Sequence, residues 1–302
     1  MKAIGVLCAR VRVEEKQIIA AVGVAGGAGM PVPPPSTPLP PGPASLDLAT
    51  LGVDSVGETV PSLEAVIDRC QSRTIAAITL PILRAAGIRV LDAGIAAAGS
   101  RLDVARALAM AGIPRPASLI GFSEESGNAA AAQLGYPSTL LPLLPGSATT
   151  SLLDADTADA VIEHRIVLGT ASEALVLMQA GAPSADERTL VHVIGGRAIA
   201  FEGAAVDGDA LAMAEAAAHA VGASLVTVEL ANAGGETVVW DLHPVADFRR
   251  AQNLGEQSVA SAIAGLVTEA SLSANGVERH LGEVPPRAIW NAEVRHGVVL
   301  SA

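Results

Sequence analysis

Short apolar runs alternate with segments of helical amphipathic spacing over the first third of the chain. A continuous apolar run is typical of a strand buried on both faces, and a repeat of three to four residues is typical of a helix packed on a sheet. The expected strands are KAIGVLCA at 2–9, SLEAVIDRC at 62–70 and IRVLD at 88–92. The pattern at 62–70 also allows a helix that runs into a strand. The expected helices are VEEKQIIAAV at 13–22 and RTIAAITLPILRAAG at 73–87. This alternation predicts a parallel α/β domain over residues 1–92.

The segment that follows the first helix is expected to be a loop. Residues 18–46 carry no charge, and IIAAVGVAGGAGM at 18–30 has the apolar character of a signal-peptide core. Its flank RVRVEEK carries acids as well as bases, and the proline-rich PVPPPSTPLPPGP follows at 31–43. These flanks favour a helix end followed by a proline-rich surface loop, with a signal or membrane segment as the alternative.

Beyond residue 92 the pattern predicts two α+β units, one over 93–182 and one over 183–270. In the first unit we expect helices at 101–112, 123–135 and 155–164 and strands at 117–122, 138–144 and 173–180. In the second unit, TLVHVIGGRAIAFEG at 189–203 and SLVTVELANAGGETVVWDLH at 224–243 each contain a Gly-Gly pair between apolar runs, which indicates a hairpin. Helices are expected at 209–222 and 258–270, and residues 271–302 are expected to form a C-terminal extension with a loop and a strand pair.

The composition narrows the class of protein. The chain has 302 residues, of which 50% are apolar and 2% aromatic, as suits close-packed α/β layers. Its net charge of -12 disfavours nucleic acid and anionic membrane surfaces as partners. Two cysteines are too few for a disulfide framework, and with no metal spacing between them they favour a reducing, cytoplasmic location.

Seven segments, in chain order and spread over all three regions, resemble the RimK/LysX-type carboxylate–amine ligases of the ATP-grasp superfamily. They are RVRVEEK, DRCQSR, AGIPRP, LGYPSTLLP, EHRIVLG, VIGGRAIA and AEAAAHAVGASLVTVEL. The resemblance covers about residues 1–270. It implies an ATP-grasp fold with an N-terminal parallel α/β subdomain and central and C-terminal α+β subdomains. It also implies a reaction in which ATP and Mg²⁺ phosphorylate a carboxylate and an amine attacks the acyl phosphate.

The chain departs from this family where the nucleotide would bind. The resemblance implies two lysines at the phosphates, and these positions fall on Arg101 and Leu141. Arg101 keeps a cation for phosphate but not a lysine's geometry, whereas Leu141 carries no charge. The implied adenine-side acid falls on Ala180, next to the candidate contact Gln179, and an implied Asp-x-Arg pair falls on Arg188 and Leu190. The glycine-rich loop keeps Gly146 and Ser147, and the substrate-binding stretch implied after residue 203 is missing.

The metal ligands implied by the resemblance fall on Glu229, Asp241 and His243. Two carboxylates and an imidazole suit Mn²⁺ or Zn²⁺ better than Mg²⁺. A shared site requires Glu229 and Asp241 on one face of their hairpin, for instance with Glu229 opposite Val239. The alternative is a set of polar residues left on one face of a hairpin.

Two further stretches have both a functional and a structural interpretation. DRCQSRT at 68–74 is either an anion-binding turn or a capped helix start. Cys70 is expected to be a buried apolar residue, not a nucleophile. RVRVEEK follows the first strand, where ligand loops lie in α/β sheets, but a solvated helix start explains it as well.

We therefore expect an ATP-grasp homologue with a degenerate nucleotide site that serves as a binding or structural subunit, as a homo-oligomer or beside an active relative. No cofactor is expected to bind strongly. The alternative is an active ligase that adds glutamate or a similar amine and uses ATP with Mg²⁺ or Mn²⁺. A small-molecule binding protein that reuses the cleft is a third hypothesis. An electropositive pocket of Arg101, Arg249 and Arg250 would favour the ligase, and a hydrophobic patch over the emptied cleft would favour a partner subunit.

Overall fold

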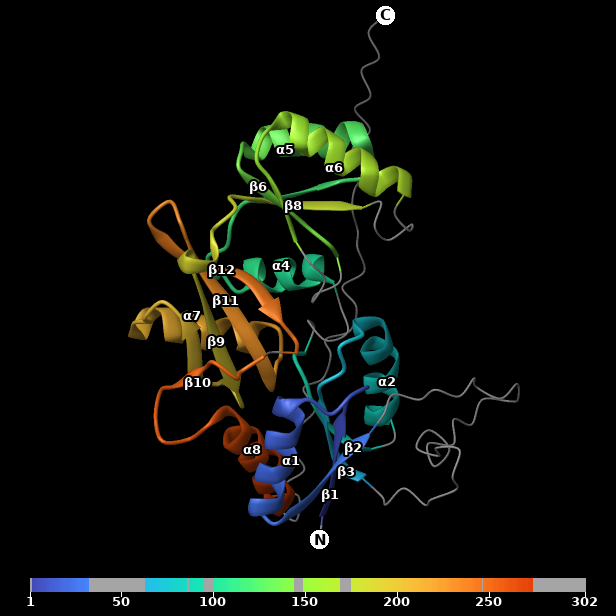
Figure 1. Cartoon of the computed structure of the whole chain (residues 1–302), viewed down its shortest axis with the longest axis vertical. Helices are drawn as coiled ribbons and strands as arrows, with labels where there is room; N and C mark the ends of the chain where they lie inside the picture. Colours follow the sequence, from blue (N-terminus) through green and yellow to red (C-terminus); the bar gives the residue numbers. More distant parts are fainter. Residues whose placement is uncertain are drawn as a thin grey trace, which may run out of the picture.

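Three β-sheets, each with its own helices, organise the chain (Figure 1). The structure is a computed structural model, and it describes residues 2–32, 63–85, 87–94, 100–143, 149–168, 175–245 and 247–273. In Figure 1 the N-terminal sheet lies at the bottom and the central sheet at the top, with the C-terminal sheet beside the helix α4 that separates them.

The N-terminal sheet is parallel throughout, in the order β2-β1-β3-β4. Its strands are β1 (Lys2–Leu7), β2 (Gly27–Val32), β3 (Leu63–Asp68) and β4 (Arg89–Leu91). Helices α1 (Val13–Val24) and α2 (Arg73–Ala85) follow the first and third of these strands. Apolar side chains of the inner strands, such as Ile4 and Ile67, are fully buried, as their sequence pattern predicts.

Strand β2 corrects the expectation that a surface loop follows α1 directly. The glycine-rich segment pairs with β1 along its whole length, from Lys2 opposite Gly27 to Leu7 opposite Val32. Gly29 allows this pairing, because a Cβ atom there would lie 3.0 Å from the carbonyl oxygen of Ile19 in α1. The absence of side chains thus lets helix and strand pack closely, and this tertiary contact overrides the weak strand propensity of glycine.

The central sheet is antiparallel, in the order β5-β8-β6-β7. Its strands are β5 (Ser118–Gly121), β6 (Ser138–Leu141), β7 (Thr150–Leu152) and β8 (Val176–Ala180), of which the short β7 is not predicted by the sequence pattern. Helices α5 (Glu124–Leu134) and α6 (Ala155–Leu168) cover one face (Figure 1). The other face looks toward α4 (Arg101–Met110) and the C-terminal sheet.

The C-terminal sheet is also antiparallel, in the order β12-β11-β9-β10-β13. Its strands are β9 (Arg188–Ile194), which follows a 3₁₀ turn at Ala185–Glu187, β10 (Arg197–Gly203), β11 (Leu225–Ala233), β12 (Glu236–His243) and β13 (Gln252–Asn253). Helix α7 (Gly208–Ala220) packs its alanines against one face. Helix α8 (Val259–Ser273) covers only part of the opposite face and packs against α1. The uncovered part of that face carries the polar residues of the candidate site.

The arrangement confirms the predicted fold class, a parallel α/β subdomain followed by two α+β units. The boundaries 1–92, 93–182, 183–270 and 271–302 stay predictions. The loop residues Gly146 and Ser147 lie outside the described residues. The extension expected from residue 271 begins within α8, which runs to Ser273, and the rest of it lies outside the described residues. None of the helices in the described parts of the chain is both long and apolar enough to cross a membrane.

Candidate functional site

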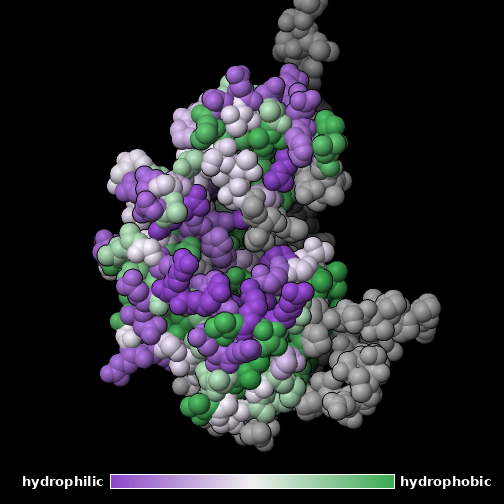
Figure 2. Space-filling view, in the orientation of Figure 1, coloured by the Kyte–Doolittle hydropathy of each residue, from purple (hydrophilic) through white to green (hydrophobic). Residues whose placement is uncertain are grey.

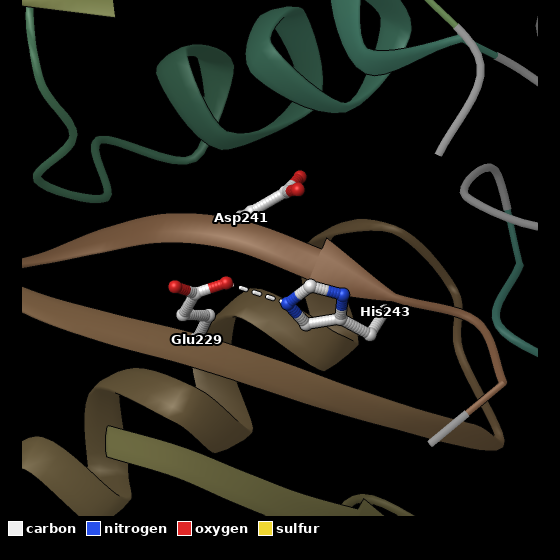
Figure 3. A group of neighbouring side chains, drawn as sticks. All are labelled: Glu229, Asp241 and His243. Atoms are coloured by element: carbon white, nitrogen blue, oxygen red, sulfur yellow. Dashed lines mark hydrogen bonds and ion pairs between the residues drawn. The ribbon is translucent and has the colours of Figure 1, made fainter. Parts of the chain in front are cut away.

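Glu229, Asp241 and His243 meet on the part of the C-terminal sheet's face that α8 does not cover, and both carboxylates are buried there. Glu229 on β11 lies directly opposite Asp241 on β12, and Thr227 lies opposite His243. The two carboxylates therefore share a face, as a common site requires, although through this direct pairing and not with Glu229 opposite Val239. One potential ligand atom from each side chain lies within 4.8 Å of the other two (Figure 3).

Glu229 is held by two nitrogen donors. Its Oε2 accepts a hydrogen bond of 2.6 Å from Nε2 of His243, and its Oε1 accepts one of 3.0 Å from Nη1 of Arg188. Burial alone would lower the pKa of His243, but the bond to Glu229 and the negative charges of Asp241 and Glu229 together raise it above its ordinary value. In its protonated form His243 donates from Nε2 to Glu229, and that nitrogen is then no metal ligand.

Asp241 is held by Arg101, the residue at the first implied lysine position. In Figure 3 Asp241 points away from its strand toward α4, the helix that begins with Arg101. Nε of Arg101 lies 3.1 and 3.0 Å from the two carboxylate oxygens, and Nη2 lies 2.7 Å from Oδ2. The two side chains are 5% and 8% exposed. Arg101 thus forms a buried ion pair across the junction between the central and C-terminal units, in place of the implied phosphate contact.

Arg188 is the site residue whose role the sequence reasoning missed. The resemblance makes Arg188 a lost aspartate, whereas in the structure its guanidinium group pairs with Glu229. Nε and Nη2 also donate to the carbonyl oxygen of Pro183, at 2.9 and 2.6 Å, and the guanidinium carbon lies 5.8 Å from the ring centroid of Trp240. A carboxylate, a carbonyl and an indole therefore fix the position of Arg188. No local sequence pattern predicts these long-range contacts.

Among the described residues, the space between Arg101, Leu141 and Gln179, where the resemblance implies nucleotide contacts, is almost filled. Leu141, at the second lysine position, is 3% exposed and lines the same small space as Arg101, Leu177 and Asp241. Gln179, the candidate cofactor contact, donates instead from Nε2 to the carbonyl oxygen of Trp240, at 3.2 Å. The cavity left between these elements measures about 30 Å³. Small-molecule pockets usually measure about 300 to 1,000 Å³, so this space alone does not accommodate a nucleotide. A separate cavity of about 460 Å³ lies beside Ala180, Gly181 and Trp240.

A larger cavity remains open on the other side of His243. It measures about 570 Å³ and is lined by Leu190, Glu202, Thr227, His243, Val245, Asp247, Arg249 and Arg250. Hydrophilic side chains form a band across the middle of the face shown in Figure 2. The cavity is not the electropositive pocket considered above, because Arg249 pairs with Asp247 and Glu14 and Arg101 pairs with Asp241.

The DRCQSRT turn has a structural role in the described residues. Asp68 accepts hydrogen bonds from both Nη atoms of Arg73, at 2.9 and 3.1 Å, and from the backbone of Cys70. Ser72 lies at the helix start and accepts from the backbone of Ile75. Burial, followed by the charge of Asp68, raises the pKa of the Cys70 thiol, which does not suit a nucleophile. The capping interpretation therefore accounts for the turn better than anion binding does.

Comparison with solved structures shows that the fold is that of the ATP-grasp superfamily. The solved structure of the RimK domain protein ATP-grasp from Sphaerobacter thermophilus DSM 20745 is 28% identical, with a TM-score of 0.70 over 88% of this chain and 99% of that one. The ATP-grasp ligase PsnB, complexed with a minimal precursor, Mg and ADP, is 19% identical, with a TM-score of 0.60 over 88% and 97% of the two chains. D-alanine–D-alanine ligase from Bacillus anthracis, complexed with ATP, is 12% identical, with a TM-score of 0.58 over 90% and 98%. The sequence matches no protein-family model.

Proposed function

We propose that this chain is an ATP-grasp homologue without ligase activity of its own, which acts as a binding or structural subunit beside an active relative in cofactor or amino-acid biosynthesis. The observation that supports this proposal is the almost filled cleft between the central and C-terminal units. Leu141, Gln179 and Arg101 all lie there, and each contacts protein groups where the resemblance implies nucleotide contacts.

The energetic cost of these changes is large. A charge-assisted hydrogen bond contributes roughly 1.5 to 3 kcal/mol, so losing those implied at Leu141 and Ala180 weakens nucleotide affinity by about a hundredfold or more. Opening the cleft would add to this cost, because the buried pair of Arg101 and Asp241 and the bond from Gln179 to Trp240 would both have to break.

The parts that remain intact suit a binding role. The three-sheet fold is complete in the described residues, and the 570 Å³ cavity has the size of a small-ligand pocket. A homo-oligomer, or an assembly with a lysine-bearing ATP-grasp chain, would explain why the fold is kept without the phosphate cations. Both cysteines are free and buried, which suits the cytoplasmic location that we propose.

An active ligase is the second candidate, and one observation favours it. Glu229, Asp241 and His243 lie close enough together to ligate one ion, and PsnB and D-alanine–D-alanine ligase have this fold and were solved with ADP and Mg or with ATP. In that case ATP with Mg²⁺ or Mn²⁺ would bind after the central unit moves away from the C-terminal sheet, and Arg101 would turn from Asp241 toward phosphate.

Thermal unfolding of the full chain separates the two candidates. A ligand at about 100 times its dissociation constant adds roughly 2.7 kcal/mol to the free energy of unfolding. For a protein of this size, that corresponds to a rise of several degrees in the melting midpoint. We expect no rise with millimolar ATP and Mg²⁺ or Mn²⁺, relative to the metal salt alone. A clear rise in the wild type that is lost in a folded Asp241→Ala would instead contradict the degenerate-site proposal and favour the ligase.

A further inference from the structure

Every carboxylate oxygen of the candidate metal cluster already accepts a hydrogen bond. Oδ1 of Asp241 accepts from Nε of Arg101 and from the backbone of Leu242, and Oδ2 accepts from Nε and Nη2 of Arg101. The two oxygens of Glu229 accept from Arg188 and His243. The two bonds at each Asp241 oxygen use both of its lone pairs, so a divalent ion reaches Asp241 only by displacing Arg101. Each Glu229 oxygen keeps one lone pair, but an ion bound there would lie beside the guanidinium group of Arg188.

The two guanidinium groups are anchored as well as paired. Nη1 of Arg101 donates to the carbonyl oxygen of Pro142 at 2.7 Å, and Arg188 donates to the carbonyl oxygen of Pro183. Arg101 therefore links a backbone carbonyl of the central unit to Asp241. Arg188 links a backbone carbonyl of the segment that follows this unit to Glu229. Each guanidinium group thus uses all three of its nitrogens in fixed directions, which a lysine ammonium group cannot reproduce.

We propose that Arg101 and Arg188 replace the divalent cation in this cluster and thereby exclude metal from it. This inference deepens the proposed loss of activity and rests on it, but it concerns the metal alone and makes no use of the nucleotide. The chain holds a complete set of metal-ligating side chains whose charge its own arginines neutralise.

Charge balance is the physical basis of the exclusion. Two carboxylates carry two negative charges, which a divalent ion would neutralise and which two guanidinium groups neutralise equally well. Adding the ion to the present cluster leaves two uncompensated positive charges with His243 neutral and three with His243 protonated, and like charges repel strongly in a mostly buried site. Arginine cannot give up its proton to relieve this repulsion, so the exclusion holds over the whole pH range of a folded protein.

Calorimetric titration of the full chain with Mn²⁺ or Zn²⁺ alone tests the proposal. The informative variant is Arg188→Gln, because this side chain is 28% exposed and its loss is the better tolerated of the two. Removing one positive charge next to a divalent ion is expected to tighten metal binding by at least about tenfold. Arg84→Gln is the matched control: it removes an arginine of 44% exposure from the buried Asp92, which lies outside the cluster.

We expect weak binding by the wild type and by Arg84→Gln, tighter binding by Arg188→Gln, and loss of the gain in Arg188→Gln/Glu229→Gln. Micromolar binding of either metal at this cluster in the wild type would overturn the proposal without any variant. Unchanged metal affinity in Arg188→Gln, shown by circular dichroism to be folded, would overturn the proposal too. Arg101→Gln repeats the same test at the second arginine. Since no nucleotide is present, these results are independent of whether ATP binds.

Discussion

Replacing Arg101 by methionine cuts the ion pair that joins the central unit to the C-terminal sheet. The change removes two nitrogen donors to Asp241 and one donor to Pro142, and it leaves the buried carboxylate without its counter-ion. Breaking a buried pair from one side costs about 3 to 5 kcal/mol, whereas replacing both partners by apolar groups is often nearly neutral. We therefore expect Arg101→Met to lower the free energy of unfolding by about 3 to 5 kcal/mol.

The double variant Arg101→Met/Asp241→Leu provides the internal check. It should recover most of the stability lost in either single variant, because no uncompensated charge remains. Urea unfolding followed by circular dichroism gives the four free energies of the double-mutant cycle. A loss below about 1 kcal/mol in Arg101→Met, the range of an exposed ion pair, would refute the argument that this pair is buried and couples the two units.

Three further outcomes are expected. Leu141→Lys restores the implied lysine but should destabilise the fold by more than about 2 kcal/mol, because its ammonium group would be buried in a cavity of about 30 Å³. It should not create ATP binding. Unfolding curves and an ATP titration of this variant test the two expectations. His192 is buried with its pKa lowered to about 4 from 6.5, so the unfolded chain binds the extra proton between these values. Stability should be complete above pH 6.5 and fall by about 3 kcal/mol as the pH drops to 4, and His192→Gln should lack this component in pH-dependent unfolding. Sedimentation of the purified chain should show an oligomer, or a monomer that assembles with a lysine-bearing ATP-grasp chain; a monomer that binds no such chain would remove the support for a subunit role.

The hydrophobic pattern predicts most of the strands and helices, and the exceptions share a physical cause. The strands that it missed, β2, β7 and β13, are rich in glycine or very short, and neighbouring strands and helices determine their conformation. In β2 the glycines themselves are the reason for the pairing, because they admit the close approach of α1. A local pattern carries no information on such a contact between separate elements.

The candidate site was predictable in part. The resemblance implied Glu229, Asp241 and His243, and a shared site required the two carboxylates to lie on one face of their hairpin, as the pairing of Glu229 with Asp241 places them. The partners of these residues were not predictable, because Arg101 is 140 residues from Asp241 and Arg188 is 41 from Glu229. In the sequence, each arginine is a departure from the family pattern; in the fold, both pair with the acids of the site.

Calorimetric titration of the full wild-type chain with ATP in the presence of Mg²⁺ tests the central claim most directly. The almost filled cleft, with Leu141 and Gln179 engaged in protein contacts, predicts no saturable heat of binding up to millimolar ATP. Stoichiometric binding with a micromolar dissociation constant would show that the cleft opens to a nucleotide, and it would contradict the account.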